Sequence, residues 1–157
     1  MVLKGILILL FGEKVIKISK LADYAVVVLA ALAKQDAASA SAADLSIASG
    51  LPAPTVAKVL KALAKGGIVT GARGAQGGYT LARAPDAITI THIITAVDGP
   101  INVTECADEA AHCMVSAVCS LHGRWAPVNR ALIGALNGVS LADVMNTPSS
   151  AIMAGAA

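Results

Sequence analysis

Residues 41–83 decide the fold, and their sequence is SAADLSIASGLPAPTVAKVLKALAKGGIVTGARGAQGGYTLAR. Ser41 and Asp44 have the spacing of a capping box, in which the serine hydroxyl accepts from the amide of Asp44 and the carboxylate bonds back. A short helix should follow and end at Gly50, since glycine readily takes the left-handed conformation at a helix C-terminus. The next four residues are a turn, and Pro54 suits the first position of a new helix. Two short helices joined by a tight turn form a helix-turn-helix.

A β-hairpin is predicted directly after the second helix, which should end at Gly66. Ile68–Thr70 and Tyr79–Leu81 are β-branched or aromatic segments on either side of a loop rich in glycine. Such a pattern is typical of two antiparallel strands. A helix-turn-helix followed by a hairpin is a winged helix, so the predicted fold is mostly α with a small β-hairpin wing.

Four more helices are predicted outside this segment. Apolar residues recur with helical spacing in Ser19–Lys34, and a helix is expected over Thr91–Val97. Ser140 and Asp143 form a second capping box, which predicts a short terminal helix. A longer helix before it has one apolar side, formed by Trp125, Val128, Leu132 and Leu136.

The composition favours helices around a core of Leu, Ile and Val, because aromatic residues make up only 3% of a chain that is 56% hydrophobic. The apolar run near the N-terminus, Ile6–Phe11, is far shorter than the roughly 20 residues that a transmembrane helix needs. Lysines follow it instead of the small-residue cleavage site of a secretory signal. We therefore expect a soluble cytoplasmic protein with no membrane association, in which residues 1–15 are an extension without a defined role.

Charge is distributed unevenly along a chain whose net charge is only +2. Residues 51–83 hold five basic side chains and no acidic one, whereas residues 84–123 hold five acidic side chains and no Lys or Arg. Such a separation indicates one face that binds a polyanion and another that avoids it. A face that is merely solvated is the alternative, and it explains single charges better than an unopposed run of five.

The second helix of the helix-turn-helix has the features of a DNA recognition helix. Lys58, Lys61 and Lys65 recur at i, i+3 and i+7, on the side opposite the apolar residues. The lysines would therefore meet phosphates at the rim of a major groove. Thr55 lies at the helix N-terminus, the end that usually contacts base edges.

The wing adds two predicted DNA contacts. Arg73 lies in a glycine-flanked loop and suits a minor groove, where arginine responds to groove width, and Gln76 is placed to bond base or sugar edges. Winged helices also serve as protein–protein modules, but the unopposed basic run favours DNA. The predicted DNA-binding residues are Thr55, Lys58, Lys61, Arg73 and Gln76.

All three cysteines lie in one segment without a clear period, at Cys106, Cys113 and Cys119, and His122 follows them. An odd number prevents complete disulfide pairing within one chain, and a cytoplasmic setting disfavours stable disulfides. Structural cysteines would scatter through a core, so this concentration of thiols predicts a metal or iron–sulfur site. The spacings are wider than those of structural zinc sites, which favours an iron–sulfur cluster but leaves zinc open. His92 is expected to pack or to cap its helix, not to bind metal.

Four stretches together resemble the Rrf-two family of winged-helix iron–sulfur regulators, which includes IscR and NsrR. They are Leu21–Val26, the wing at Arg73–Arg83, the three-cysteine loop and Leu141–Met145. The similarity extends in order over about residues 16–145 and is strongest to regulators of SUF-type iron–sulfur assembly operons. It implies a homodimer, in which the helix with the apolar side crosses its counterpart, and a palindromic double-stranded DNA operator at which transcription is usually repressed.

The resemblance also implies a set of cluster ligands. Cys106, Cys113 and Cys119 would bind the cluster, with 2Fe–2S favoured and 4Fe–4S as the other form. For the fourth ligand, His122 matches the histidine of IscR-like members, and Asp23 matches the acidic residue that NsrR-like members contribute from the other subunit. His122 is favoured because it is local. The recognition helix departs from the IscR pattern, so no operator sequence is carried over.

The leading hypothesis is a DNA-binding transcriptional repressor that senses iron–sulfur cluster status and controls SUF-type assembly genes. The alternatives are a cluster repressor that senses nitric oxide or redox state and a DNA-binding protein with a structural zinc site. A thiol redox enzyme is disfavoured because the chain has no Cys-x-x-Cys pair, so we expect neither catalysis nor a small-molecule substrate. The predicted organisation is 1–15 (extension), 16–84 (winged helix-turn-helix DNA-binding region), 85–123 (helix and cysteine loop), 124–146 (dimerisation and terminal helices) and 147–157 (flexible tail).

Overall fold

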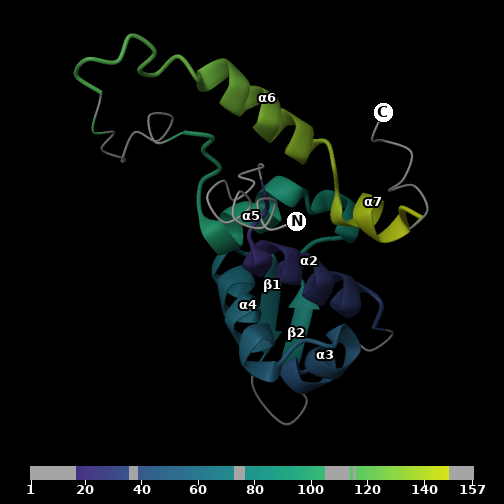
Figure 1. Cartoon of the computed structure of the whole chain (residues 1–157). Helices are drawn as coiled ribbons and strands as arrows, with labels where there is room; N and C mark the ends of the chain where they lie inside the picture. The colour runs from purple at the N-terminus through teal and green to yellow at the C-terminus, as the bar shows by residue number, and fades with distance from the viewer. Residues whose placement is uncertain (1–16, 36–38, 73–76, 105–113, 115, 149–157) are drawn as a thin grey trace, which may run out of the picture.

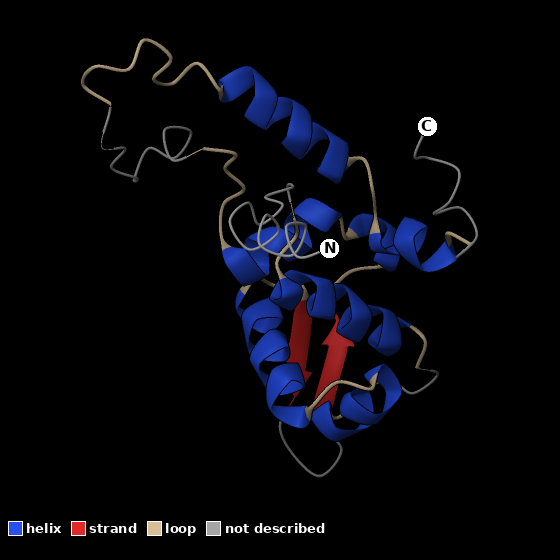
Figure 2. Cartoon of the chain, viewed as in Figure 1, coloured by secondary structure: helices blue, strands red, loops and turns tan. Residues whose placement is uncertain are grey.

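The computed structural model of the chain describes residues 17–35, 39–72, 77–104, 114 and 116–148. Figure 1 shows a body of helices around a hairpin, with α6 set apart from it above α5. Figure 2 shows the two strands lying among α2, α3 and α4. The elements are α2 (Lys20–Ala33), α3 (Ala42–Ser49), α4 (Ala53–Lys65), β1 (Val69–Ala72), β2 (Gly78–Leu81), the 3-10 turn η1 (Pro85–Ala87), α5 (Ile90–Asp98), α6 (Ala126–Asn137) and α7 (Leu141–Asn146).

The helix-turn-helix forms as its local sequence predicts. The Ser41 hydroxyl accepts from the Asp44 amide at 3.1 Å, and the Asp44 carboxylate accepts from the Ser41 amide at 3.1 Å. Gly50 ends α3 with φ of 69°, in the left-handed region. One boundary differs, because α4 begins at Ala53 and places Pro54 at the second helical position. The helix starts at Ala53 because the Pro52 carbonyl accepts the first helical hydrogen bonds, from the amides of Thr55 and Val56.

The core is built from aliphatic side chains, as the composition predicts. The buried hydrophobic residues among those described are all Ala, Val, Leu or Ile, and no buried polar or charged residue lies among them. They come from α2, α3, α4, α5, the hairpin and α7, so these elements share one core. The largest fully buried side chains are Leu29, Leu45, Leu60, Leu63, Ile68, Ile88, Ile93 and Leu141.

The hairpin lies where it was predicted, although β1 starts one residue later and ends two residues later than expected and β2 starts one residue earlier. Val69 lies opposite Leu81 in an antiparallel register. A further contact was not predicted: Ala40, just before the capping box, pairs with Tyr79 through two backbone hydrogen bonds of 3.1 and 2.8 Å. Gly78 permits this approach, because a Cβ there would lie 2.9 Å from the Ala40 carbonyl oxygen. The wing is therefore fixed to the start of α3.

The C-terminal elements return to the body beside η1 and α5. The Ile90 amide donates to the Val139 carbonyl at 2.9 Å, and the Leu141 amide donates to the Ile88 carbonyl at 2.8 Å. The predicted second capping box is present, with Ser140 and Asp143 bonding reciprocally. Leu141 is fully buried, so α7 belongs to the core of the body.

The capping role expected for one histidine is confirmed. His92 Nδ1 accepts from the Thr89 amide at 3.1 Å, and the Thr89 hydroxyl accepts from the His92 amide at 3.3 Å. The helix that they begin, α5, is one residue longer at each end than predicted. No helix in the described part of the chain has the length and hydropathy needed to cross a membrane.

A side chain at Gly78 should displace the wing from α3. Gly78→Ala would force the Ala40 backbone away and should lower the free energy of unfolding by about 1–3 kcal/mol, as overpacking usually does. Gly134→Ala is the matched control, because nothing lies within 4 Å of a Cβ there. In a helix interior that change should be neutral or stabilising by up to about 1 kcal/mol. Urea unfolding measures both, and equal effects would contradict the close approach.

The two capping carboxylates should make stability fall in acid. Hydrogen bonds from Ser41 hold the pKa of Asp44 below its ordinary value of 3.8, and bonds from Ser140 do the same for the pKa of Asp143. Since both pKa values are lower in the folded protein, this stabilisation is complete well above 3.8 and is lost as the pH falls through the folded values. Asp44→Asn/Asp143→Asn should melt below the wild type near neutral pH, with the gap closing as the pH falls below 3.8. A gap independent of pH would show that the charges do not matter.

Candidate nucleic-acid interface and metal-binding loop

Helix α4 presents the predicted lysine face to solvent. Lys58, Lys61 and Lys65 are all exposed. The opposite face is fully buried in the core and is formed by Val56, Val59, Leu60 and Leu63. Thr55 is half-buried in the first turn of the helix. Because the apolar face is held in the core, the lysines are left available for phosphate contacts.

The C-terminal end of α4 lies directly against α5. A Cβ at Gly66 would lie only 2.5 Å from the Ala96 Cβ, so the two helices approach more closely than any side chain at this position would allow. Helix α4 also contacts α2 and α3. The orientation of α4 is therefore fixed by three neighbouring helices.

The two wing residues predicted to contact DNA, Arg73 and Gln76, lie outside the described residues. The strands on either side of them are in place, and Tyr79 packs beside Gly71, where a Cβ would lie 3.3 Å from the ring. Arg83 is exposed just after β2, within the same basic run. It is a further candidate for phosphate contact that the sequence analysis counted as charge without assigning a role.

The described part of the cysteine loop holds two of the predicted ligands, Cys119 and His122. They lie in one turn, in which the His122 amide donates to the Cys119 carbonyl at 3.3 Å. Cys119 is half-buried and free of any disulfide, and His122 is exposed. A thiol and an imidazole in one turn are donors that suit either zinc or an iron–sulfur cluster.

The described residues include Asp23, the alternative fourth ligand, but not the other two predicted cysteine ligands. Cys106 and Cys113 lie outside the described residues. Asp23, the alternative fourth ligand, is exposed in the first turn of α2. Among the residues that the structure describes, no three His, Cys, Asp or Glu side chains lie together as a metal site.

Two hydrogen bonds that the sequence did not predict join α6 to Asn102 and Val103, which precede the cysteines and form the base of the cysteine loop. The Val103 amide donates to Asn129 Oδ1 at 3.1 Å, and Asn129 Nδ2 donates to Asn102 Oδ1 at 3.5 Å. No local sequence signal marks this contact, because its partners are 26 and 27 residues apart.

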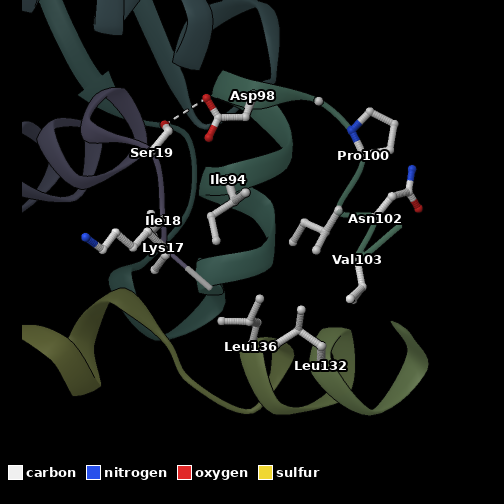
Figure 3. Close-up of a pocket in the computed structure, with 12 residues that line it drawn as sticks. Lys17, Ile18, Ser19, Ile94, Asp98, Pro100, Asn102, Val103, Leu132 and Leu136 are labelled. Carbon is white, nitrogen blue, oxygen red and sulfur yellow. Dashed lines mark hydrogen bonds between the residues drawn. The ribbon is translucent and has the colours of Figure 1, made fainter. Parts of the chain in front are cut away.

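A mainly apolar cavity of about 370 Å³ lies beside this base, between the start of α2, the end of α5 and α6. Figure 3 shows Ile18 and Ile94 facing Leu132 and Leu136 across it, with Val103 on the loop side. At the edge of the cavity the Ser19 hydroxyl donates to Asp98 Oδ1 at 2.9 Å.

The family model named Rrf2 and described as an iron-dependent transcriptional regulator matches residues 18–147. The chain belongs to the Rrf2 family. The HTH-type transcriptional regulator IscR of Erwinia tasmaniensis is 31% identical over 112 residues, which are 71% of this chain and 67% of that protein. The putative HTH-type transcriptional regulator ORF2 of Azotobacter vinelandii is 32% identical over 105 residues, 67% of this chain and 63% of that protein. The matched part thus spans about two thirds of each relative.

Solved structures of Rrf2-type regulators have the same fold. CymR, the global cysteine regulator of B. subtilis, has 27% identity and a TM-score of 0.63, over 83% of this chain and 97% of that one. IscR of T. potens has 27% identity and a TM-score of 0.59, over 88% and 92%. The predicted family and winged-helix fold are confirmed. The relatives are regulators and not enzymes, as expected, so this Rrf2 protein is a DNA-binding transcriptional regulator.

Removing lysines from α4 should weaken DNA binding and its dependence on salt. Each phosphate contact contributes about 0.9 to the slope of log affinity against log salt, so Lys58→Ala/Lys61→Ala should reduce that slope by about 1.8. Titration of a random-sequence duplex at several salt concentrations measures it. Arg130→Ala removes one positive charge at an exposed position on α6, outside the winged helix, and serves as the control for a loss of charge elsewhere. An unchanged slope in the double lysine variant would remove α4 from the interface.

Proposed function

We propose that this Rrf2 protein is a repressor that senses iron–sulfur cluster status and controls SUF-type cluster-assembly genes. The observation that carries the proposal is the presence, in one chain, of an exposed lysine face on a winged helix and a thiol–imidazole turn. The first supplies affinity for DNA, and the second supplies soft ligands whose occupancy changes with iron and sulfide supply.

Cys106, Cys113, Cys119 and His122 are the proposed ligands, with a 2Fe–2S cluster favoured over 4Fe–4S. Support comes from the wide spacing of the cysteines, from the turn that joins Cys119 to His122, and from the description of the family as iron-dependent. His122 is preferred to Asp23 because it lies in the same turn as a cysteine ligand. The occupancy and the oxidation state of a bound cluster would depend on iron and oxidants, whereas the protein would supply the cluster ligands and the DNA-binding surface.

The protein is proposed to act as a homodimer at a palindromic operator. Helix α6 has no buried residue, and its apolar side chains Trp125 and Val128 remain 40% and 49% exposed. Leu132 and Leu136 on the same side are only half-buried. An apolar stripe that stays open on a helix set apart from the body is suited to a second copy of α6. A two-fold dimer would present two recognition helices to a palindrome.

Purification without oxygen should give a coloured protein with iron and sulfide in equal amounts. Absorption and EPR spectra with iron, sulfide and zinc analysis measure this, and Cys119→Ala should abolish the colour. His122→Ala should bleach the spectrum, while Asp23→Ala should leave it intact. Colourless protein with stoichiometric zinc would overturn the sensing proposal and leave a structural zinc site. Bleaching by Asp23→Ala alone would move the fourth ligand to the other subunit.

Cluster occupancy should change affinity for the operator. One DNA sequence would be selected from a random library with the cluster-loaded protein and another with the apo protein. Each selected sequence would then be titrated with both forms of the protein. A differential affinity between the two states is what any cluster-driven switch requires. Equal affinities for every selected sequence would exclude a sensing role even for a protein that holds the cluster.

A further inference from the structure

We infer that Asn129 is a positioning residue that closes the base of the cysteine loop and so determines how firmly the chain holds its cluster. The inference rests on the proposed function, because it assigns a role toward the proposed cluster. It concerns one group of residues, Asn102, Val103 and Asn129, which we call the Asn129 clamp. Asn129 lies in the first turns of α6, just after the loop, and the other two residues lie just before Cys106.

The clamp uses both ends of the asparagine amide. Asn129 Oδ1 accepts from the Val103 backbone amide at 3.1 Å, and Nδ2 donates to Asn102 Oδ1 at 3.5 Å. The side chain is half-buried, whereas its neighbours Val128 and Arg130 are exposed. Asparagine is a weak helix former, so its presence here does not serve α6 itself. Its contacts serve the segment that leads into the loop.

The clamp joins the two ends of the segment that carries the proposed ligands. The bonded residues Val103 and Asn129 are 26 positions apart, and all three cysteines and His122 fall between them. Cys106 follows Val103 by three residues, so it stays within about 10 Å of the clamp. On the other arm, the turn holding Cys119 and His122 runs directly into α6.

Closing the base lowers the entropic cost of gathering the ligands. Without the clamp, fewer contacts would hold the arm that carries Cys106 beside the arm that carries His122, so the ends of the loop would be less constrained. Part of the free energy of the metal–ligand bonds would then be used to order the ligand-bearing segments, which weakens net binding. Val103 also lines the apolar cavity beside the clamp together with Leu132 of α6, so this cavity likewise keeps the segment before the loop near α6.

The test compares Asn129→Ala with Asn129→Asp and with a control on the same helix. Asn129→Ala removes both contacts, whereas Asn129→Asp keeps an oxygen acceptor for the Val103 amide. Loss of one or two hydrogen bonds should speed the removal of iron by a chelator by about five- to tenfold in Asn129→Ala. Asn129→Asp should stay within about twofold of the wild type, since the acceptor remains.

Asn137→Ala is the control, because Asn137 lies at the far end of α6 and its side chain accepts from the Thr89 hydroxyl at 3.4 Å. It should leave the rate of iron loss unchanged. Hydrogen exchange of the Val103 amide in the apo protein reports the clamp without any cluster, and it should quicken in Asn129→Ala alone.

Equal rates of iron loss in the wild type and Asn129→Ala would overturn the inference, as would Asn129→Asp losing iron as fast as Asn129→Ala. A fall in the melting temperature of the apo protein that is the same for Asn129→Ala and Asn137→Ala, without faster iron loss, would reduce Asn129 to a structural role. A wild type that takes up no iron would instead contradict the proposed function. In that case a protected Val103 amide would show that the clamp exists but has no cluster to position.

Discussion

Burial of the apolar face of α4 is the interaction on which the rest of the molecule depends. Val56, Val59, Leu60 and Leu63 are completely removed from solvent, and each such side chain stabilises the fold by about 1.5–3 kcal/mol. No rotation of α4 that exposed these residues could be offset by surface lysines, whose exposed contacts are weak. The helical period then leaves Lys58, Lys61 and Lys65 on the solvent side. The exposed lysine face that is predicted to bind DNA is therefore a consequence of core packing.

Helix α6 is stabilised by much less burial than α4. It contributes no buried residue to the core, although Leu136 packs against the core, and the chain after it rejoins the body through the backbone bonds of Val139 and Leu141. Its principal neighbour in the body is α5, which in turn contacts α4 where Gly66 meets Ala96. A helix with little burial thus follows the cysteine loop directly, and α5 lies between this helix and α4.

Local signals in the sequence were enough to predict the winged helix. The capping boxes at Ser41 and Ser140, the terminal glycines and the helical periods are each complete within a few residues. The contacts that were missed join distant residues: Ala40 with Tyr79, Ile88 with Leu141, and Val103 with Asn129. Each depends on which segments the core brings together, and that is not encoded in any short pattern. The arrangement of the cysteine ligands stays a prediction, because Cys106 and Cys113 lie outside the described residues.

The described residues of the cysteine loop explain why it suits a ligand-dependent role. Residue 114 and residues 116–125 form turns only, and Met114, Val118 and Leu121 are 99%, 86% and 53% exposed. Isolated turn bonds, such as that from the Arg124 amide to the Leu121 carbonyl at 3.0 Å, give such a segment little stability of its own. Segments of low local stability are the ones whose conformation bound ligands can set. A stable core holds the α4 lysine face that is proposed to bind DNA, and residues 116–125, which have little local stability, carry two of the proposed ligands; the proposed sensing role needs both, since one part must stay fixed while the other responds.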